Sequence, residues 1–280
     1  MKLRPVATDD GSLEEVAALL AAAFPGVRYL DARYLAWAYR GGPDGSALGF
    51  NAYEEGRLAA HYVTQPLRAR VAGVEERGLL SFHTATHPDF RGRGLFTELA
   101  RATFEEAARR GYGHVVGVAN AASSPGFVRR LGFQLVSPLD VRLGLGLRSE
   151  PRGGEEPAYE RIWSGPAVRW RLACPARSYR AVRRGPAAVV YAPAGRLGIW
   201  AELGRLPEAL VAPELAPLRG RPIRLWMGLE PGGVRWLGSL GVPARLRPSP
   251  LNLIFLDLAG RRRTLDPARV RFSAIDFDAY

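Results

Sequence analysis

A glycine-rich turn, Arg91-Gly92-Arg93-Gly94, has the residue types needed to bind a phosphate group. It follows a strand predicted to end at Thr86 and precedes a helix predicted to begin at Leu95. The N-terminus of a helix presents unpaired backbone N–H groups and the positive end of the helix dipole. Glycines let the backbone approach an anion closely, and arginines donate forked hydrogen bonds. The pattern therefore predicts a pyrophosphate-binding turn.

Two histidines near this turn are candidates for acid–base chemistry. His83 lies on the preceding strand, and histidine is the residue type that most often exchanges protons in catalysis, so it is a candidate general base. His87 stands before Pro88 and is predicted to be a turn residue. The two histidines cannot share a zinc ion, because four residues of extended strand separate them by about 13 Å. No metal site is predicted, and the lone Cys174 is predicted to be a buried apolar residue.

The elements that must position these residues alternate between helices and short strands. Ser12 is the expected N-cap of the first helix, with Glu15 completing a capping box. Hydrophobic spacing and turn signals predict further helices at 29–39, 95–110 and 124–131. Strands are predicted at 4–7, 49–53, 57–65, 76–86 and 114–119, followed by a strand pair that extends to residue 147.

The turn and the segment that follows it resemble the GNAT superfamily of N-acetyltransferases. The acyl-CoA motif of that superfamily is Arg or Gln, two residues, Gly, one residue, then Gly or Ala. Arg91, Gly94 and Phe96 occupy these positions here. The next motif, a strand ending at Asn and a short helix closing in Leu-Gly-Phe, resembles Asn120 and the run 131–133.

The resemblance implies which residues contact acyl-CoA. They are Thr84, Ala85, Thr86, Arg91, Gly92, Arg93, Gly94, Leu95, Phe96, Asn120, Ser123 and Phe127. It also implies that backbone N–H groups of Ala85 and Thr86 stabilise the oxyanion. Two positions depart from the family pattern. Phe96 replaces a small residue, and Phe127 or Val128 stands where many members have a tyrosine that protonates the departing thiolate.

The general base is not defined by these motifs. His83, His87, an acidic residue from another strand and the carboxylate at Tyr280 are the candidates. Tyr280 is included because the chain terminus reaches the catalytic centre in similar tandem acetyltransferases. The alternative for the segment 271–277 that precedes it is a plain edge strand with a frayed end.

The implied fold is α/β (α+β), a GNAT fold with a mixed central sheet flanked by helices, duplicated along the chain. The predicted domains are 1–147 for acyl-CoA binding, a polar linker at 148–160 and a degenerate GNAT-like copy at 161–280. The repeat places Phe127 on Trp236, and Trp37 on Trp170. The second copy lacks an Arg-rich glycine turn, so it is predicted to close the substrate cleft rather than to form a second active site.

Composition limits the function classes. The 280 residues include 47% hydrophobic and 24% charged residues, as in ordinary globular proteins. No apolar run is long enough to span a membrane, and the first residues lack the pattern of a secretory signal, so a cytoplasmic protein is expected. The net charge of +12 comes from dispersed arginines, which makes nucleic-acid binding the less favoured interpretation.

The resemblance therefore implies an acyl-CoA-dependent N-acyltransferase that uses acetyl-CoA and no metal. The expected acceptor is a primary amine of a small molecule. The alternative is a non-catalytic acyl-CoA-binding or nucleic-acid-associated module, which the missing tyrosine and the excess of arginine would explain.

Overall fold

The computed structural model describes residues 1–151, 156–195, 198–213, 215–220, 222–243, 247 and 251–277. The first half contains β1 (Lys2–Pro5), α1 (Asp10–Ala23), α2 (Ala32–Arg40), β2 (Leu48–Glu54), β3 (Arg57–Val71), β4 (Val74–Thr86), a 3-10 turn (Pro88–Phe90), α3 (Leu95–Arg109), β5 (His114–Ala119), a π-helical turn (Gly126–Arg130), β6 (Gln134–Pro138) and β7 (Asp140–Pro151). The second half contains β8 (Tyr159–Arg161), α4 (Gly165–Leu172), β9 (Arg180–Arg184), β10 (Ala187–Pro193), β11 (Ile199–Pro207), β12 (Ile223–Leu229), β13 (Val234–Gly241), β14 (Asn252–Asp257), β15 (Val270–Ser273) and 3-10 turns at Glu208–Leu210, Pro267–Arg269 and Ala274–Asp276.

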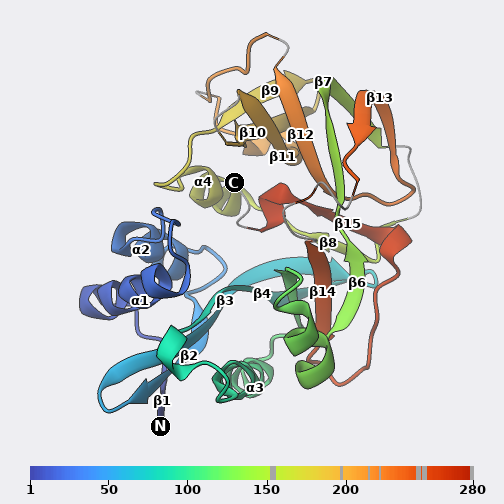
Figure 1. The fold of residues 1–280 in the computed structure, drawn as a ribbon. Helices are drawn as coiled ribbons and strands as arrows, with labels where there is room; N and C mark the ends of the chain where they lie inside the picture. Colours follow the sequence, from blue (N-terminus) through green and yellow to red (C-terminus); the bar gives the residue numbers. More distant parts are fainter. Residues whose placement is uncertain are drawn as a thin grey trace.

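The strands form two mixed sheets that two short strands join into one continuous sheet (Figure 1). The first sheet has the spatial order β1-β2-β3-β4-β5-β14-β6, and the second has the order β9-β10-β11-β12-β7-β13. β8 pairs with β3 and β15, and β15 pairs with β12, so these two short strands join the sheets. The architecture is mixed α/β with few helices, which agrees with the predicted GNAT-type fold.

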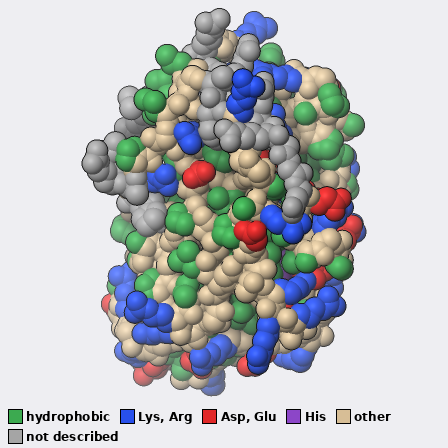
Figure 2. All heavy atoms as spheres, turned by 90° about the vertical axis from the view of Figure 1, so that its right-hand side faces the viewer, with side chains coloured by type: hydrophobic (Ala, Val, Ile, Leu, Met, Phe, Trp, Pro, Cys, Tyr) green, Lys and Arg blue, Asp and Glu red, His purple; other side chains and the backbone are tan. Residues whose placement is uncertain are grey.

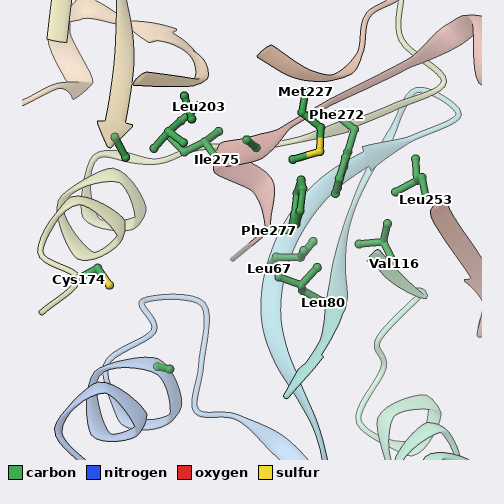
Figure 3. Packing of buried hydrophobic residues seen from close by; sticks show 14 of the residues in the cluster. Leu67, Leu80, Val116, Cys174, Leu203, Met227, Leu253, Phe272, Ile275 and Phe277 are labelled. Atoms are coloured by element: carbon green, nitrogen blue, oxygen red, sulfur yellow. The ribbon is translucent and has the colours of Figure 1, made fainter. Parts of the chain in front are cut away.

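Helices cover both faces of the first sheet. α1 and α2 pack on one face, and α3 packs on the other. Alternation along β5 shows the two faces, because Val116 belongs to the core under α1 and α2 whereas Val115 belongs to the core under α3. The first of these cores continues into the second half through Met227, Phe272 and Ile275 (Figure 3).

Each sheet contains a strand from the other half of the chain. β14 lies between β5 and β6 of the first sheet, with Ile254 opposite Gly117. β7 lies between β12 and β13 of the second sheet, with Leu225 opposite Leu143. The two sheets are therefore interlocked by a reciprocal exchange of one strand. The predicted linker 148–160 begins inside β7, includes residues 152–155 that lie outside the described residues, and ends within β8.

Two local expectations were wrong. The N-cap of α1 is Asp9, which has an extended backbone and accepts a hydrogen bond from the Ser12 N–H at 3.0 Å, so Ser12 lies inside the helix. The repeat alignment also placed the short helix before Leu131 on the segment around Trp236, and that segment is strand β13. β13 pairs with β7 from the first half, and this long-range pairing decides its conformation.

The structure also bears on two smaller expectations, the burial of Cys174 and the lack of a membrane-spanning helix. Cys174 is buried, as predicted. None of the helices in the described part of the chain is long and apolar enough to cross a membrane.

Candidate functional site

The predicted phosphate turn has the required backbone conformation. Gly92 and Gly94 both have φ of 78°, a left-handed conformation that favours glycine, and Gly94 is the N-cap of α3. A Cβ atom placed on either glycine would meet no atom within 4 Å, so the space in front of the helix is open. A hollow of about 210 Å³ lies there. It is lined by Thr86, Phe90, Arg91, Gly92, Arg93, Gly94, Leu95, Phe96, Thr97 and Arg130.

The two arginines of the turn differ in their contacts. Arg93 donates a hydrogen bond to the Glu54 carboxylate at 2.8 Å, and its guanidinium lies 5.1 Å from the centre of the Phe90 ring. Arg91 is exposed at the rim of the hollow. Arg91 is thus the better placed of the two to meet an incoming anion, and Arg93 holds the turn against the β2–β3 hairpin.

The Phe96 ring lies at the hollow and packs against other aromatic rings. It packs edge-on against Phe127, with centroids 5.0 Å apart, and Phe127 packs on Phe133 at 5.1 Å. A Cβ on Gly126 would come within 2.9 Å of the Phe96 ring, so glycine at 126 makes room for the large side chain. The site thus brings Phe96 and Phe127 together as one aromatic contact between α3 and the π-helical turn.

β4 and β5 separate beside the turn. They pair in parallel only from Gly78 to Ser81, and β4 continues to Thr86 without a partner on that edge among the described residues. The His87 N–H donates to the Ala59 carbonyl of β3 at 2.9 Å. Because successive N–H groups of a strand point to opposite edges, the Thr86 N–H faces the opening and the Ala85 N–H faces β3. Of the two expected oxyanion donors, only Thr86 has the right direction.

A β-bulge in β4 places His83. The register between β3 and β4 shifts at this point, and His83 has φ of 45°, which is unusual for a residue with a side chain. The bulge turns the imidazole toward α2, where its Nδ1 lies 3.4 Å from the Tyr39 hydroxyl and its Nε2 lies 3.5 Å from the Tyr34 hydroxyl. The His83 side chain is partly exposed, as are most side chains in this part of β4.

Asn120 and Ser123 form a closed turn at the end of β5. The Asn120 side-chain oxygen accepts from the Ser123 N–H at 2.9 Å, and the Ser123 hydroxyl accepts from the Asn120 N–H at 3.1 Å. Their side chains therefore shape the backbone beside the opening. Asn252 of β14 donates to Ser124 at 3.0 Å and ties this turn to the exchanged strand.

The second half covers the side of the site that faces α2. A small cavity of about 20 Å³ lies between the two halves of the chain. Phe82, the neighbour of His83 in the sequence, is one of its lining residues. The other lining residues are Tyr34, Trp37, Ala38, Gln65, Leu80, Arg161, Trp170, Arg171, Ile275, Asp276 and Phe277. Tyr280, the other predicted base, lies outside the described residues.

The sequence interpretation missed several residues. A groove of about 780 Å³ runs from Gly94 along α3 and is bordered by Arg101, Arg129 and Arg130. The pair of arginines before Leu131 was a visible signal for it. Tyr34 and Tyr39 were also missed, since nothing local distinguishes them from the other aromatic residues of α2. Among the described residues, no cluster of His, Cys, Asp or Glu could hold a metal ion.

Comparisons with known proteins agree with this geometry. Residues 3–136 match the family model of the acetyltransferase (GNAT) domain. No curated protein sequence matches the chain. A GCN5-related N-acetyltransferase from Anabaena variabilis is similar in structure, with a TM-score of 0.61 and 10% identity over 92% of this chain and 73% of that one.

Two further solved structures share the fold. A GCN5-related N-acetyltransferase from Kribbella flavida has a TM-score of 0.60 and 14% identity, covering 92% of this chain and 71% of its own. Eis1 from Mycobacterium abscessus has a TM-score of 0.54 and 15% identity, covering 92% and 74%. Residues 3–136 therefore match the GNAT acetyltransferase domain, and the chain shares its fold with solved N-acetyltransferases over most of its length.

Proposed function

We propose that the chain is an acyl-CoA-dependent N-acyltransferase that transfers acetyl from acetyl-CoA to a primary amine of a small molecule. The observation that carries this proposal is the left-handed turn at Gly92 and Gly94, which opens α3 toward a hollow beside the diverging strands. Open backbone at a helix N-terminus favours a pyrophosphate, and the gap between β4 and β5 admits a narrow chain that leads to the opposite face.

The basic groove along α3 suits the remaining phosphate of CoA. Arg101, Arg129 and Arg130 border the groove, and Arg130 also lines the hollow at the turn. Its carboxylates, Glu98 and Glu105, leave the five charged side chains with a net positive charge. These residues extend the predicted cofactor set from the turn to the edge of the π-helical turn.

The transfer forms a C–N bond and breaks the C–S bond of the thioester. The amine nitrogen attacks the carbonyl carbon, the Thr86 N–H donates to the developing oxyanion, and the thiolate leaves. An alkylamine with a pKa near 10.4 must lose its proton at neutral pH, which costs about 4.6 kcal/mol. His83, on the α2 side of the opening, is the proposed acceptor of that proton. A thiol with a pKa near 8.5 leaves readily, so phenylalanine at 127 is compatible with turnover.

The second half completes the acceptor side in this proposal. Trp170 and Phe277 line the same small cavity as Tyr34 and Phe82, so the second half supplies aromatic side chains on the α2 side of the site. The proposed units remain 1–147 and 161–280, as two copies of one fold. The reciprocal positions of β14 and β7 support a duplication, because each strand occupies the same place relative to a parallel pair, β4–β5 or β11–β12.

A non-catalytic acyl-CoA-binding module is the second candidate, and the missing hydroxyl at Phe127 favours it. Release of free CoA from acetyl-CoA, measured with a panel of primary amines, distinguishes the two functions. Amine-dependent release supports the transferase. Binding of acetyl-CoA without release by any amine would support the module.

The distribution of positive charge on the surface is relevant to whether the protein binds nucleic acid. Figure 2 shows the Lys and Arg side chains of one face in separate groups, with other residues between them, rather than in one continuous strip. Salt-sensitive binding to DNA or RNA would favour a nucleic-acid-associated module.

A further inference from the structure

A chain of hydrogen-bonded side chains leads from Asn51 on β2 to His83 in the bulge of β4. His61 Nδ1 lies 2.6 Å from Asn51 Oδ1, and His61 Nε2 lies 3.0 Å from the Tyr39 hydroxyl. The same hydroxyl lies 3.4 Å from His83 Nδ1.

The middle of this chain is sealed from solvent. Asn51, His61 and Tyr39 are 2%, 0% and 0% exposed. Burial, and to a lesser extent the nearby His83, lowers the pKa of His61 to about 3, so His61 is neutral at physiological pH and carries one ring proton. Burial raises the pKa of Tyr39 well above its ordinary value, so its hydroxyl keeps its proton. Neutral His61 and the Tyr39 hydroxyl therefore each have one proton to donate.

The direction of each hydrogen bond follows from the Asn51 amide oxygen at the start of the chain. An amide oxygen only accepts, so the single proton of His61 must lie on Nδ1, which faces Asn51 Oδ1. His61 Nε2 is consequently an acceptor.

The same reasoning gives the direction of the hydrogen bond between Tyr39 and His83. Tyr39 donates its one proton to His61 Nε2, so the Tyr39 oxygen is left to accept from His83 Nδ1. We propose that this chain holds neutral His83 as the Nδ1-protonated tautomer, with the lone pair on Nε2, and that Tyr39 is the positioning residue that does so.

The inference rests on the proposed function only for the use of that lone pair. In the transferase, Nε2 would accept the proton of the attacking amine, and the fixed tautomer would keep it ready to do so. The bulge supports the arrangement, because the positive φ of His83 is what brings Nδ1 to Tyr39. Which nitrogen carries the proton is a property of the resting protein and does not depend on catalysis.

Nitrogen-15 NMR of histidine-labelled protein tests the tautomer directly, since protonated and unprotonated ring nitrogens of neutral histidine resonate far apart. The chain has four histidines, and the His83 signals are assigned by their loss in His83→Ala. We expect a protonated Nδ1 and an unprotonated Nε2 for His83 in its neutral form. A proton on Nε2, or an equal mixture of tautomers, would overturn the proposal.

Two variants test whether Tyr39 sets the tautomer of His83. Tyr39→Phe removes the acceptor of the Nδ1 proton and is expected to move both His83 signals toward the average of the two tautomers. Tyr34→Phe is the matched control, because it removes a hydroxyl next to Nε2 of the same ring. Unchanged signals in a folded Tyr39→Phe protein would show that Tyr39 does not set the tautomer.

Activity measurements separate this inference from the proposed function. In an active enzyme, Tyr39→Phe is expected to lower kcat by roughly tenfold or more while the KM for acetyl-CoA stays within about twofold, because Tyr39 lies on the α2 side. If Tyr39→Phe does not fold, the wild-type spectrum alone decides the tautomer. A protein with the expected tautomer but no transferase activity would refute the function and leave the tautomer assignment standing.

Discussion

The indole rings of Trp37 and Trp170 stack 4.7 Å apart and within 10° of parallel. Each indole N–H donates to the backbone carbonyl of the other residue, at 2.9 Å from Trp37 and 3.1 Å from Trp170. The two residues occupy equivalent places in the proposed repeat, one in α2 and one in α4. Their reciprocal contact is what a two-fold relation between the halves would produce.

This pair is expected to couple the stability of the two halves. Trp37→Phe and Trp170→Phe should each destabilise the protein by about 1–3 kcal/mol through a lost hydrogen bond and poorer stacking. Because the residues touch, the double variant should cost less than the sum of the single ones by at least about 0.5 kcal/mol. Urea unfolding measures all three, and Trp200→Phe is the control. Simple additivity would contradict the coupling.

Replacing Gly94 by valine should weaken acetyl-CoA binding at least tenfold. A β-branched side chain is strained at φ of 78° and would occupy the open space in front of α3. Gly111→Val is the matched control, since Gly111 also has φ of 78° and open surroundings but lies at the other end of α3. Calorimetry on both variants compares the affinities. Equal affinity in the two would remove the assignment of the phosphate turn.

Titration with acetyl-CoA should give one molecule bound per chain. The second half keeps a diverging parallel pair, since β11 and β12 pair only from Ile199 to Glu202. A cavity of about 270 Å³ lies beyond it, lined by both acidic and basic side chains, but no glycine turn leads into a helix there in the part of the chain that the structure describes. A stoichiometry of two in calorimetry would show that this cavity binds acyl-CoA as well.

Replacing His83 by glutamine should lower kcat by about 10²-fold to 10⁴-fold at neutral pH, as expected for loss of a general base. The KM for acetyl-CoA should change little, because His83 lies toward α2 rather than toward the phosphate turn. Steady-state kinetics with saturating amine measures the change. Full activity in His83→Gln would remove His83 as the proposed general base.

Acid should destabilise the protein through Glu76. Burial alone would raise the pKa of Glu76, but hydrogen bonds from His114 at 2.7 Å and Arg263 at 2.8 Å outweigh it and lower the pKa from 4.5 to about 2. The stability from this depressed pKa is present above about pH 4.5 and is lost as the pH falls toward 2, by up to about 3 kcal/mol. Chemical unfolding at several pH values should show a shallower loss in Glu76→Gln than in the exposed control Glu14→Gln. Parallel curves for the two variants would contradict this role.

The phosphate turn and α3 were predictable from the sequence because their geometry is local. Glycines that allow positive φ, the helix after them and its end near Arg110 all depend on residues within a few positions of one another. The same holds for the strands β2 to β5, whose ends matched the expected ranges closely except that β3 continues to Val71. Helix caps were harder, since Asp9 and Ser12 can both cap and only the backbone conformation at Asp9 distinguishes them.

Tertiary structure decided everything that depends on partners far apart in the chain. The insertion of β14 between β5 and β6 pairs Ile254 with Gly117, and no local pattern specifies which sheet a short apolar strand will join. The orientation of His83 likewise depends on a bulge between the pairs His61–Ala85 and Val63–Phe82, and on Tyr39 from another element. Amino-acid type made His83 a candidate base, but the tautomer that we propose for it depends on the packing around a buried and therefore neutral His61.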